Sequence, residues 1–229
     1  MILKKWEELP EELRLDEVKP YYDLLSCKKG SLVFKRGFDV AASLIMLVLL
    51  SPAFLTLAVA IKVDSPGPVF FRQKRITQYG KEFKIFKFRT MVNNAEKLGT
   101  QVTVNNDSRI TKVGSFIRGC RLDEIPQLLN VLRGDMSFVG TRPEVIKYVD
   151  KYSNEMLATL LMPAGVTSEA SILYKDEAER LEKADNPDEV YVNEILPEKM
   201  KYNLESIKNF SFINDIKTMG RTIFAVFKN

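Results

Sequence analysis

Residues 40–61, VAASLIMLVLLSPAFLTLAVAI, contain no charged side chain, and Pro52 lies near their middle. As a straight helix this stretch is long enough to span a bilayer hydrocarbon core of about 30 Å. A proline inside a helix removes a backbone hydrogen bond and clashes with the preceding turn, so Pro52 predicts a break. We expect the Ser51 hydroxyl to bond a carbonyl freed at that break. The segment therefore predicts a membrane element that bends in its middle.

Basic side chains flank the apolar segment on both sides, namely Lys28, Lys29, Lys35 and Arg36 before it and Lys62, Arg72, Lys74 and Arg75 after it. Short basic flanks tend to stay on the cytoplasmic side of a membrane. A helix that enters, breaks at Ser51-Pro52 and returns to the same face satisfies both flanks. A signal anchor that crosses the membrane with a proline kink is the alternative, and the residues alone leave it open.

The amino-acid composition limits which side chains can catalyse a reaction and which partners the chain can bind. The chain has 229 residues, a formal net charge of +4, two cysteines and no histidine. Triads and metal sites that need histidine are therefore excluded, so carboxylates, lysines, arginines or a hard metal ion must carry any reaction. The clustered basic residues suit an anionic membrane surface or a phosphate-bearing substrate. No familiar nucleic-acid-binding motif is present, and we expect no nucleic-acid partner.

The remaining sequence predicts an α+β body. We expect residues 1–30 to form an N-terminal appendage and residues 31–229 a catalytic domain, with the membrane element at 35–63. Alternation of apolar and basic residues predicts a strand over Phe83–Arg89, and Val69–Phe71 suggests a shorter one. Hydrophobic spacing and turn residues predict a helix followed by a polar loop over 91–105, and helices at 122–133, 144–161, 176–184, 194–209 and 215–227. The last helix is amphipathic, which fits either the membrane interface or packing on the core.

The adjacent acids Asp123 and Glu124 are the sharpest candidates for catalysis. An aspartate can attack phosphorus and become phosphorylated, while a neighbouring glutamate holds Mg²⁺. Acids at a helix start also compensate the helix dipole, so capping is the alternative role. Arginines surround the pair, and the planar guanidinium suits bidentate contact with phosphate. They are Arg118, Arg121, Arg133 and Arg142.

Eight short motifs occur along the chain in a fixed order: Lys35-Arg36-x-x-Asp39, Ser51-Pro52, Asp64–Gln73, Phe86–Met91, Asp107-x-Arg109-Ile110-Thr111, Leu122–Leu128, Asn130–Ser137 and Gly140–Pro143. In this order they resemble the monotopic phosphoglycosyl transferases, bacterial sugar transferases that begin polyprenyl-linked glycan assembly. The resemblance covers about residues 35–220.

The resemblance implies a monotopic membrane protein with a re-entrant helix-break-helix and a small cytoplasmic body with interfacial amphipathic helices. It implies transfer of a sugar-1-phosphate from a UDP-sugar to undecaprenyl phosphate with release of UMP, at the cytoplasmic face of the bacterial inner membrane. The glycan could be an exopolysaccharide, a capsule, an O-antigen or a glycoprotein. The implied partners are both substrates and membrane lipids, and a homo-oligomer is left open.

The same resemblance implies roles for individual residues. Asp123 is the expected nucleophile, and Glu124 helps to bind Mg²⁺. Arg118 and Arg142 engage substrate phosphates. Lys35, Arg36 and Asp39 sit at the headgroup boundary: the basic pair meets lipid phosphate, and Asp39 bonds backbone near the Ser51-Pro52 break.

The chain departs from the family pattern at several positions. Many members carry glycine where Thr77 stands and a small hydroxyl residue where Arg121 stands, and residues 168–177 differ from the usual run after Thr167. That last difference leaves the sugar undetermined. A non-catalytic membrane adaptor and a phosphatase that passes its phosphoaspartate to water are the alternative functions.

Overall fold

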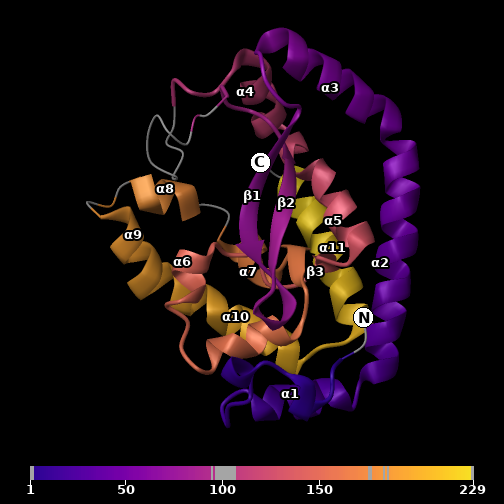
Figure 1. Ribbon diagram of the computed structural model, residues 1–229, viewed down its shortest axis with the longest axis vertical. Coiled ribbons are helices and arrows are strands. Elements are labelled where there is room, and N and C mark those ends of the chain that lie inside the picture. The colour runs from indigo at the N-terminus through magenta and orange to yellow at the C-terminus, as the bar shows by residue number, and fades with distance from the viewer. Residues whose placement is uncertain are drawn as a thin grey trace.

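The computed structural model describes residues 3–93, 95, 107–174, 177–182, 184 and 186–227. Helices dominate, and two small two-stranded sheets lie among them (Figure 1). The predicted α+β class is therefore confirmed. The helix and polar loop predicted over 91–105 lie largely outside the described residues, although Met91 forms an isolated antiparallel bridge with Ile110.

The apolar segment forms two helices, α2 (Lys29–Leu49) and α3 (Ser51–Asp64), which are bent by 61° at the break between them. Pro52 lies in the first turn of α3, where its missing N–H costs nothing. The Ser51 hydroxyl donates to the Val48 carbonyl at 2.8 Å, as predicted. Among the described residues no single helix has the length and hydropathy of a membrane span, but this bent pair has both.

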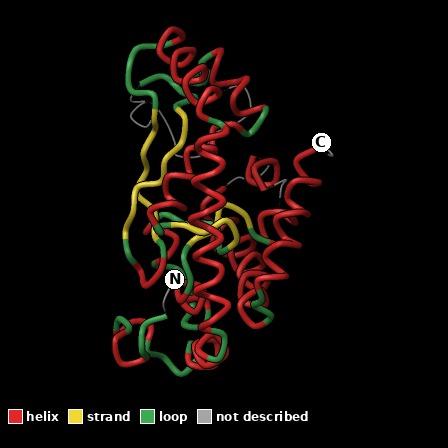
Figure 2. Tube along the Cα trace, turned by 90° about the vertical axis from the view of Figure 1, so that its right-hand side faces the viewer, coloured by secondary structure: helices red, strands yellow, loops and turns green. Residues whose placement is uncertain are grey.

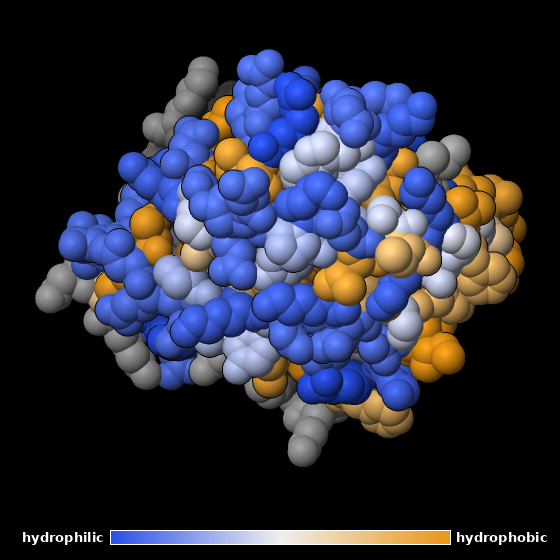
Figure 3. Space-filling view, turned by 90° about the horizontal axis from the view of Figure 1, so that it is seen from below, coloured by the Kyte–Doolittle hydropathy of each residue, from blue (hydrophilic) through white to orange (hydrophobic). Residues whose placement is uncertain are grey.

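Large apolar side chains are exposed along α2 and α3: Val33, Phe34, Leu44, Ile45, Met46, Val48, Leu49, Leu55, Val59 and Val63. Seen from below, apolar residues gather on the side of the molecule where α2 runs (Figure 3). Exposure of such a surface to water is unfavourable in free energy, and large contiguous apolar patches on proteins mark interaction or membrane sites. The helix pair therefore provides a face suited to lipid.

Charged residues join the first half of α2 to the body. Lys35 is 2% exposed, and its Nζ donates to Asp215 at 2.6 Å and to the Val139 carbonyl at 2.9 Å. The expectation that Lys35 meets lipid phosphate is therefore wrong, because its ammonium is already buried in a protein ion pair. Asp39 accepts from the Phe138 N–H at 3.4 Å. Ser51 lies roughly 18 Å further along the chain at about 1.5 Å rise per residue, so Asp39 does not bond the break.

Arg36 makes the second attachment. It donates to the Val131 and Leu132 carbonyls, at 2.6 Å and 2.8 Å, near the end of α5 (Leu128–Arg133). A cation there satisfies orphan carbonyls and complements the helix dipole. Arg36 thus also uses its donors within the protein instead of on lipid.

The first sheet pairs β1 (Phe70–Ile76) with β2 (Glu82–Phe88) in antiparallel register, with Phe70 opposite Phe88. Both strands were predicted, although β1 runs further than expected. The second sheet pairs β3 (Met136–Val139) with β4 (Ala164–Thr167) in parallel. These four-residue strands were not predicted, because neither is long enough to show a period.

Two predicted helices are divided. Residues 122–133 form a 3₁₀ turn, η5 (Leu122–Gln127), followed by α5, with Pro126 inside the first part. The single helix expected over 144–161 is wrong, since only α6 (Ile146–Val149) and η6 (Met156–Leu161) form there. The other short helices after α3 in the described part of the chain are α4 (Lys112–Gly119), α7 (Glu169–Leu173), α8 (Glu177–Glu182) and α9 (Pro187–Val190), with a 3₁₀ turn η3 (Gln78–Gly80) and a π-helix η7 (Tyr191–Ile195).

The C-terminal helices α10 (Leu196–Lys208) and α11 (Phe212–Phe227) agree with prediction. The N-terminal turns η1 (Trp6–Glu8) and η2 (Glu11–Leu13) and helix α1 (Lys19–Ser26) share a buried apolar cluster with η6 and α10. The domain boundary at residue 30 stays a prediction.

Candidate active site

The Asp123-Glu124 pair lies on η5, directly after a sharp change of chain direction. Arg121 adopts a left-handed conformation (φ 53°) between α4 and η5. A non-glycine residue in that region is strained by about 1 kcal/mol or more. The reversal places both carboxylates against strand β2 instead of at the start of one continuous helix.

Strand β2 is fixed beside η5 by a buried amide. The side chain of Asn130 is fully buried; its Oδ1 accepts from the Phe86 N–H at 2.9 Å, and its Nδ2 donates to the Lys84 carbonyl at 3.0 Å. These bonds satisfy the strand edge that faces η5. They also set the position of the next residue, Lys87.

Lys87 and Arg142 hold the carboxylate of Glu124 between them. The Lys87 Nζ lies 2.8 Å from Glu124 Oε1, and an Arg142 guanidinium nitrogen lies 2.7 Å from the same oxygen. Lys87 Nζ is also 3.9 Å from Asp123 Oδ2. The structure therefore brings three predicted residues together, Asp123, Glu124 and Arg142, and adds Lys87.

The two acids have opposite electrostatic surroundings. Burial raises the pKa of Asp123, and Glu124 adds to this, while Lys87 and Arg118 act against it. Burial would also raise the pKa of Glu124, but the charges of Arg142 and Lys87 outweigh it and lower that pKa well below its ordinary value. Glu124 is thus firmly ionised, whereas Asp123 is the more basic carboxylate.

Arg142 is aimed by close packing of two glycine backbones. Gly140 N–H donates to the Thr167 carbonyl at 3.0 Å, and Gly165 N–H donates to the Thr141 carbonyl at 2.8 Å. A Cβ on Gly165 would lie 2.2 Å from the Gly140 backbone, so no larger residue fits there. The loop after β3 is therefore pressed onto β4, and Arg142 projects toward Glu124.

Two cavities open beside the acid pair. One, of about 520 Å³, is lined by Asp123 and by several basic residues: Arg72, Lys87, Arg89, Arg109 and Arg118. The other, of about 420 Å³, is lined by Glu124, Arg142 and mostly apolar side chains of α2, η5 and α11. Neighbouring residues on one 3₁₀ turn thus face different cavities.

The remaining predicted residues lie elsewhere. Arg133 is exposed and stacks over Phe86, with its guanidinium carbon 4.9 Å from the ring centroid. Ser51 and Pro52 lie at the α2–α3 break. The residue that sequence reasoning missed is Lys87; it stands in the Phe86–Met91 motif, but the apolar–basic alternation of that stretch suggested only a solvated strand face.

Two adjacent carboxylates suit a magnesium ion. Mg²⁺ is commonly bound by one or two carboxylates together with substrate phosphates and waters. Asp123 and Glu124 supply two carboxylates beside a basic cavity. In the described part of the chain, no group of three or more acidic or cysteine side chains is placed to hold a metal ion by itself. The donor set therefore fits a metal that arrives with a phosphorylated substrate.

Comparison with known proteins shows the family of this chain. The bacterial sugar transferase family matches residues 30–229. The chain belongs to that family. The match includes η5, β2 and the Arg142 loop, as well as the bent helix pair except for the first residue of α2.

Curated relatives carry more specific names. A UDP-N-acetylgalactosamine-undecaprenyl-phosphate N-acetylgalactosaminephosphotransferase of Aeromonas hydrophila is 38% identical over 82% of this chain and 42% of its own length. A UDP-glucose:undecaprenyl-phosphate glucose-1-phosphate transferase of Escherichia coli K12 is 37% identical over 96% of this chain and 45% of its own length. A transferase of the same name from Caulobacter vibrioides is 35% identical over 82% of this chain and 68% of its own length. The chain thus spans less than half of the first two relatives.

Proposed function

We propose that this chain transfers a sugar-1-phosphate from a UDP-sugar to undecaprenyl phosphate and releases UMP, as the first membrane step of glycan assembly. One observation carries the proposal: Asp123, a half-buried carboxylate with a raised pKa, lines a cavity rich in arginine and lysine. Family membership and the names of the relatives support the same reaction.

In the first step, a carboxylate oxygen of Asp123 attacks the phosphorus attached to the sugar. A bond forms between that oxygen and phosphorus, and the bond from phosphorus to the bridging oxygen breaks, so UMP leaves with the electron pair. Arg118 lines the same cavity as Asp123 and stabilises the phosphoryl oxygens. Lys87 lies within 4 Å of Asp123 and holds the carboxylate ionised for attack.

In the second step, a phosphate oxygen of the polyprenyl acceptor attacks the phosphorus of the phosphoaspartate. The acyl phosphate bond breaks, Asp123 regains its carboxylate, and the sugar diphosphate remains on the lipid. Arg142 contacts the same Glu124 oxygen as Lys87 but lines the other cavity, and we assign it to the acceptor phosphate.

Mg²⁺ belongs to the proposal through Glu124. Glu124, with the substrate diphosphate, would hold the ion, which when bound would neutralise negative charge on the diphosphate from which UMP leaves. Lys87 and Arg142 keep Glu124 ionised and oriented for that role.

We further propose that α2 and α3 form a re-entrant hairpin that keeps the body on the cytoplasmic face of the inner membrane. The basic flanks and the 61° bend support it. The amphipathic helix α11 exposes Ile213, Ile216, Ile223 and Phe224, which suits the same interface.

The test is a panel of UDP-sugars, incubated with the purified chain, undecaprenyl phosphate and Mg²⁺. UMP release that needs the metal, with formation of a polyprenyl-diphosphate sugar, is the expected result. Release of UMP without a lipid product would favour a phosphatase that passes its phosphoaspartate to water. Absence of UMP release with every UDP-sugar would favour a non-catalytic membrane adaptor. The sugar that reacts fastest names the donor.

A further inference from the structure

The cavity beside Glu124 is a groove between α2 and α11. Phe38, Ala42, Met46 and Leu50 line one side at helical spacing, and Met219 and Ile223 line the other. Its volume of about 420 Å³ falls within the roughly 300–1,000 Å³ typical of small-molecule sites. An apolar groove of this size in water would favour an apolar occupant.

The groove is closed at one end. The ring of Phe212, at the start of α11, lies edge-on to Phe34 and Phe38 of α2, with centroids 4.8 Å and 5.2 Å away. The buried Lys35–Asp215 ion pair ties the same ends together. A helix or strand of a partner protein could not pass through this end.

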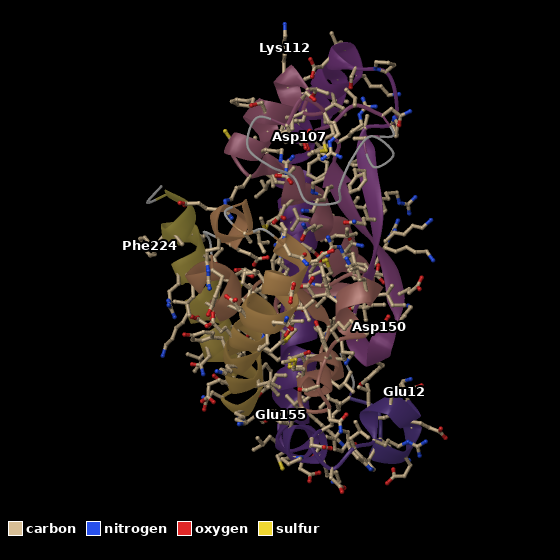
Figure 4. All side chains as sticks on the ribbon, turned by 90° about the vertical axis from the view of Figure 1, so that its left-hand side faces the viewer. Glu12, Asp107, Lys112, Asp150, Glu155 and Phe224 are labelled. Carbon is tan, nitrogen blue, oxygen red and sulfur yellow. The ribbon has the colours of Figure 1, made fainter. Side chains whose placement is uncertain are left out.

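The other end is open toward the proposed membrane face. α11 leans away from α2 toward the C-terminus (Figure 2), and Phe224 projects outward from α11 (Figure 4). The mouth residues Met46 and Ile223 are 40% and 58% exposed. A hydrogen bond of 2.7 Å between Thr167 and Thr222 holds α11 to β4, so the opening is preformed.

The charged groups of the groove gather where it reaches η5: Glu124, Arg121 and Arg142 line it there, while Thr167, Ser171 and Thr222 add hydroxyl groups along its walls. Arg142 is paired with Glu124, so together with Arg121 the two guanidinium groups outnumber the one carboxylate and leave a net positive charge that suits an anion. Gln127 is 1% exposed, and its side-chain Nε2 has no hydrogen-bond partner among the described residues. A buried donor without a partner costs about 1–3 kcal/mol, which a ligand oxygen would offset.

We propose that this groove seats the first isoprene units of the polyprenyl phosphate acceptor, with the phosphate at Arg142 and Gln127 and the chain leaving toward the membrane between Met46 and Ile223. The proposal rests on the proposed function and deepens it. The donor then occupies the basic cavity beside Asp123, so the two substrates reach the acid pair from different cavities.

The test measures binding of undecaprenyl phosphate to the purified full chain in detergent micelles. Ala42→Trp fills the groove, and Ala41→Trp, on the adjacent exposed position of α2, is the matched control. Ala42→Trp should weaken binding at least tenfold, and Ala41→Trp should leave it within twofold. Equal affinities for the two variants would overturn the proposal, as would the absence of binding by the unmodified chain.

A second pair of variants keeps the proposal testable if the tryptophan in Ala42→Trp prevents folding. Ile172→Ala removes a contact from the groove wall, while Leu173→Ala changes an exposed neighbour outside it. Only Ile172→Ala should weaken binding, and equal effects of the two would overturn the proposal.

Two competing lipids distinguish the contribution of the phosphate from that of the prenyl chain. Undecaprenol, which lacks the phosphate, should compete at least tenfold less well, and Gln127→Leu should reduce that difference. Displacement by phosphatidylglycerol as effective as by undecaprenyl phosphate would overturn the assignment to a prenyl chain. Binding that survives these tests in a chain that releases no UMP would refute the proposed function while the groove assignment stands.

Discussion

The two cavities beside the acid pair have similar volumes, about 520 Å³ and 420 Å³, but their linings differ. One is lined by Asp123 and basic side chains, and the other by Glu124, Arg142 and apolar side chains of the helices α2 and α11. Successive residues on a 3₁₀ helix point about 120° apart, so one turn can serve both cavities. The contacts from Lys87 through Glu124 to Arg142 form a line of alternating charge between them. In the proposed function, the nucleophile belongs to one cavity and the phosphate of the acceptor to the other.

The largest expected effect comes from removing the nucleophile. Asp123→Asn keeps the size of the side chain but loses the attacking charge, so turnover should fall by about a thousandfold or more. Steady-state UMP release is the measurement, and an unchanged melting temperature is the control. Glu124→Gln should also disable the enzyme, mainly through the metal. Near-normal activity of Asp123→Asn would refute the mechanism.

Substitutions of the two arginines should distinguish the roles of the two cavities. Lysine keeps the charge but loses the planar fork, so Arg118→Lys and Arg142→Lys should each lose on the order of a hundredfold in activity. The mechanism predicts a burst of UMP without acceptor; Arg118→Lys should slow that burst, and Arg142→Lys should mainly slow transfer to the lipid. Arg133→Lys is the control, because Arg133 is exposed over Phe86 and lines neither cavity. Small, equal losses in all three variants would mean that neither arginine binds phosphate.

The pH dependence tests the role of Lys87. Because burial raises the pKa of Asp123, the protonated and inactive acid should already accumulate at a pH above the usual range for aspartate. Lys87 lowers that pKa, so Lys87→Met should raise it further and move the acid limb of kcat/KM for the UDP-sugar to higher pH. An acid limb that stays in place or moves to lower pH would exclude Lys87 from this role.

The smallest expected effect concerns the membrane element. In a cysteine-free chain, single cysteines at Lys29 and Lys62 should both resist an impermeant thiol reagent in intact cells and both react after permeabilisation. Labelling of only one site in intact cells would show that the segment crosses. Pro52→Ala should straighten the break and convert a fraction of molecules to the crossing form.

Sequence patterns predicted the parts of this molecule that carry a strong local signal. The broken apolar segment, the strand around Phe86 and the acid pair were all visible, because Pro52, the alternation and the charges act locally. The division of 122–133 was not predicted, since its apolar spacing fits one continuous helix although Pro126 and the left-handed Arg121 impose a 3₁₀ turn.

Long-range contacts account for the rest. Lys35 resembled a lipid-facing cation until folding placed Asp215 beside it, 180 residues along the chain. Lys87 resembled a surface strand residue until Asn130 fixed β2 against η5. The groove between α2 and α11 also depends on packing between the two ends of the sequence, which no local pattern encodes.

The covalent intermediate tests the central claim most directly. The purified chain should be mixed with the preferred UDP-sugar and Mg²⁺ without any lipid acceptor, then digested and examined by mass spectrometry. We predict a phosphosugar on Asp123 that disappears when undecaprenyl phosphate is added. A phosphosugar on another residue, or lipid product formed with no adduct on Asp123 at any time, would contradict the account.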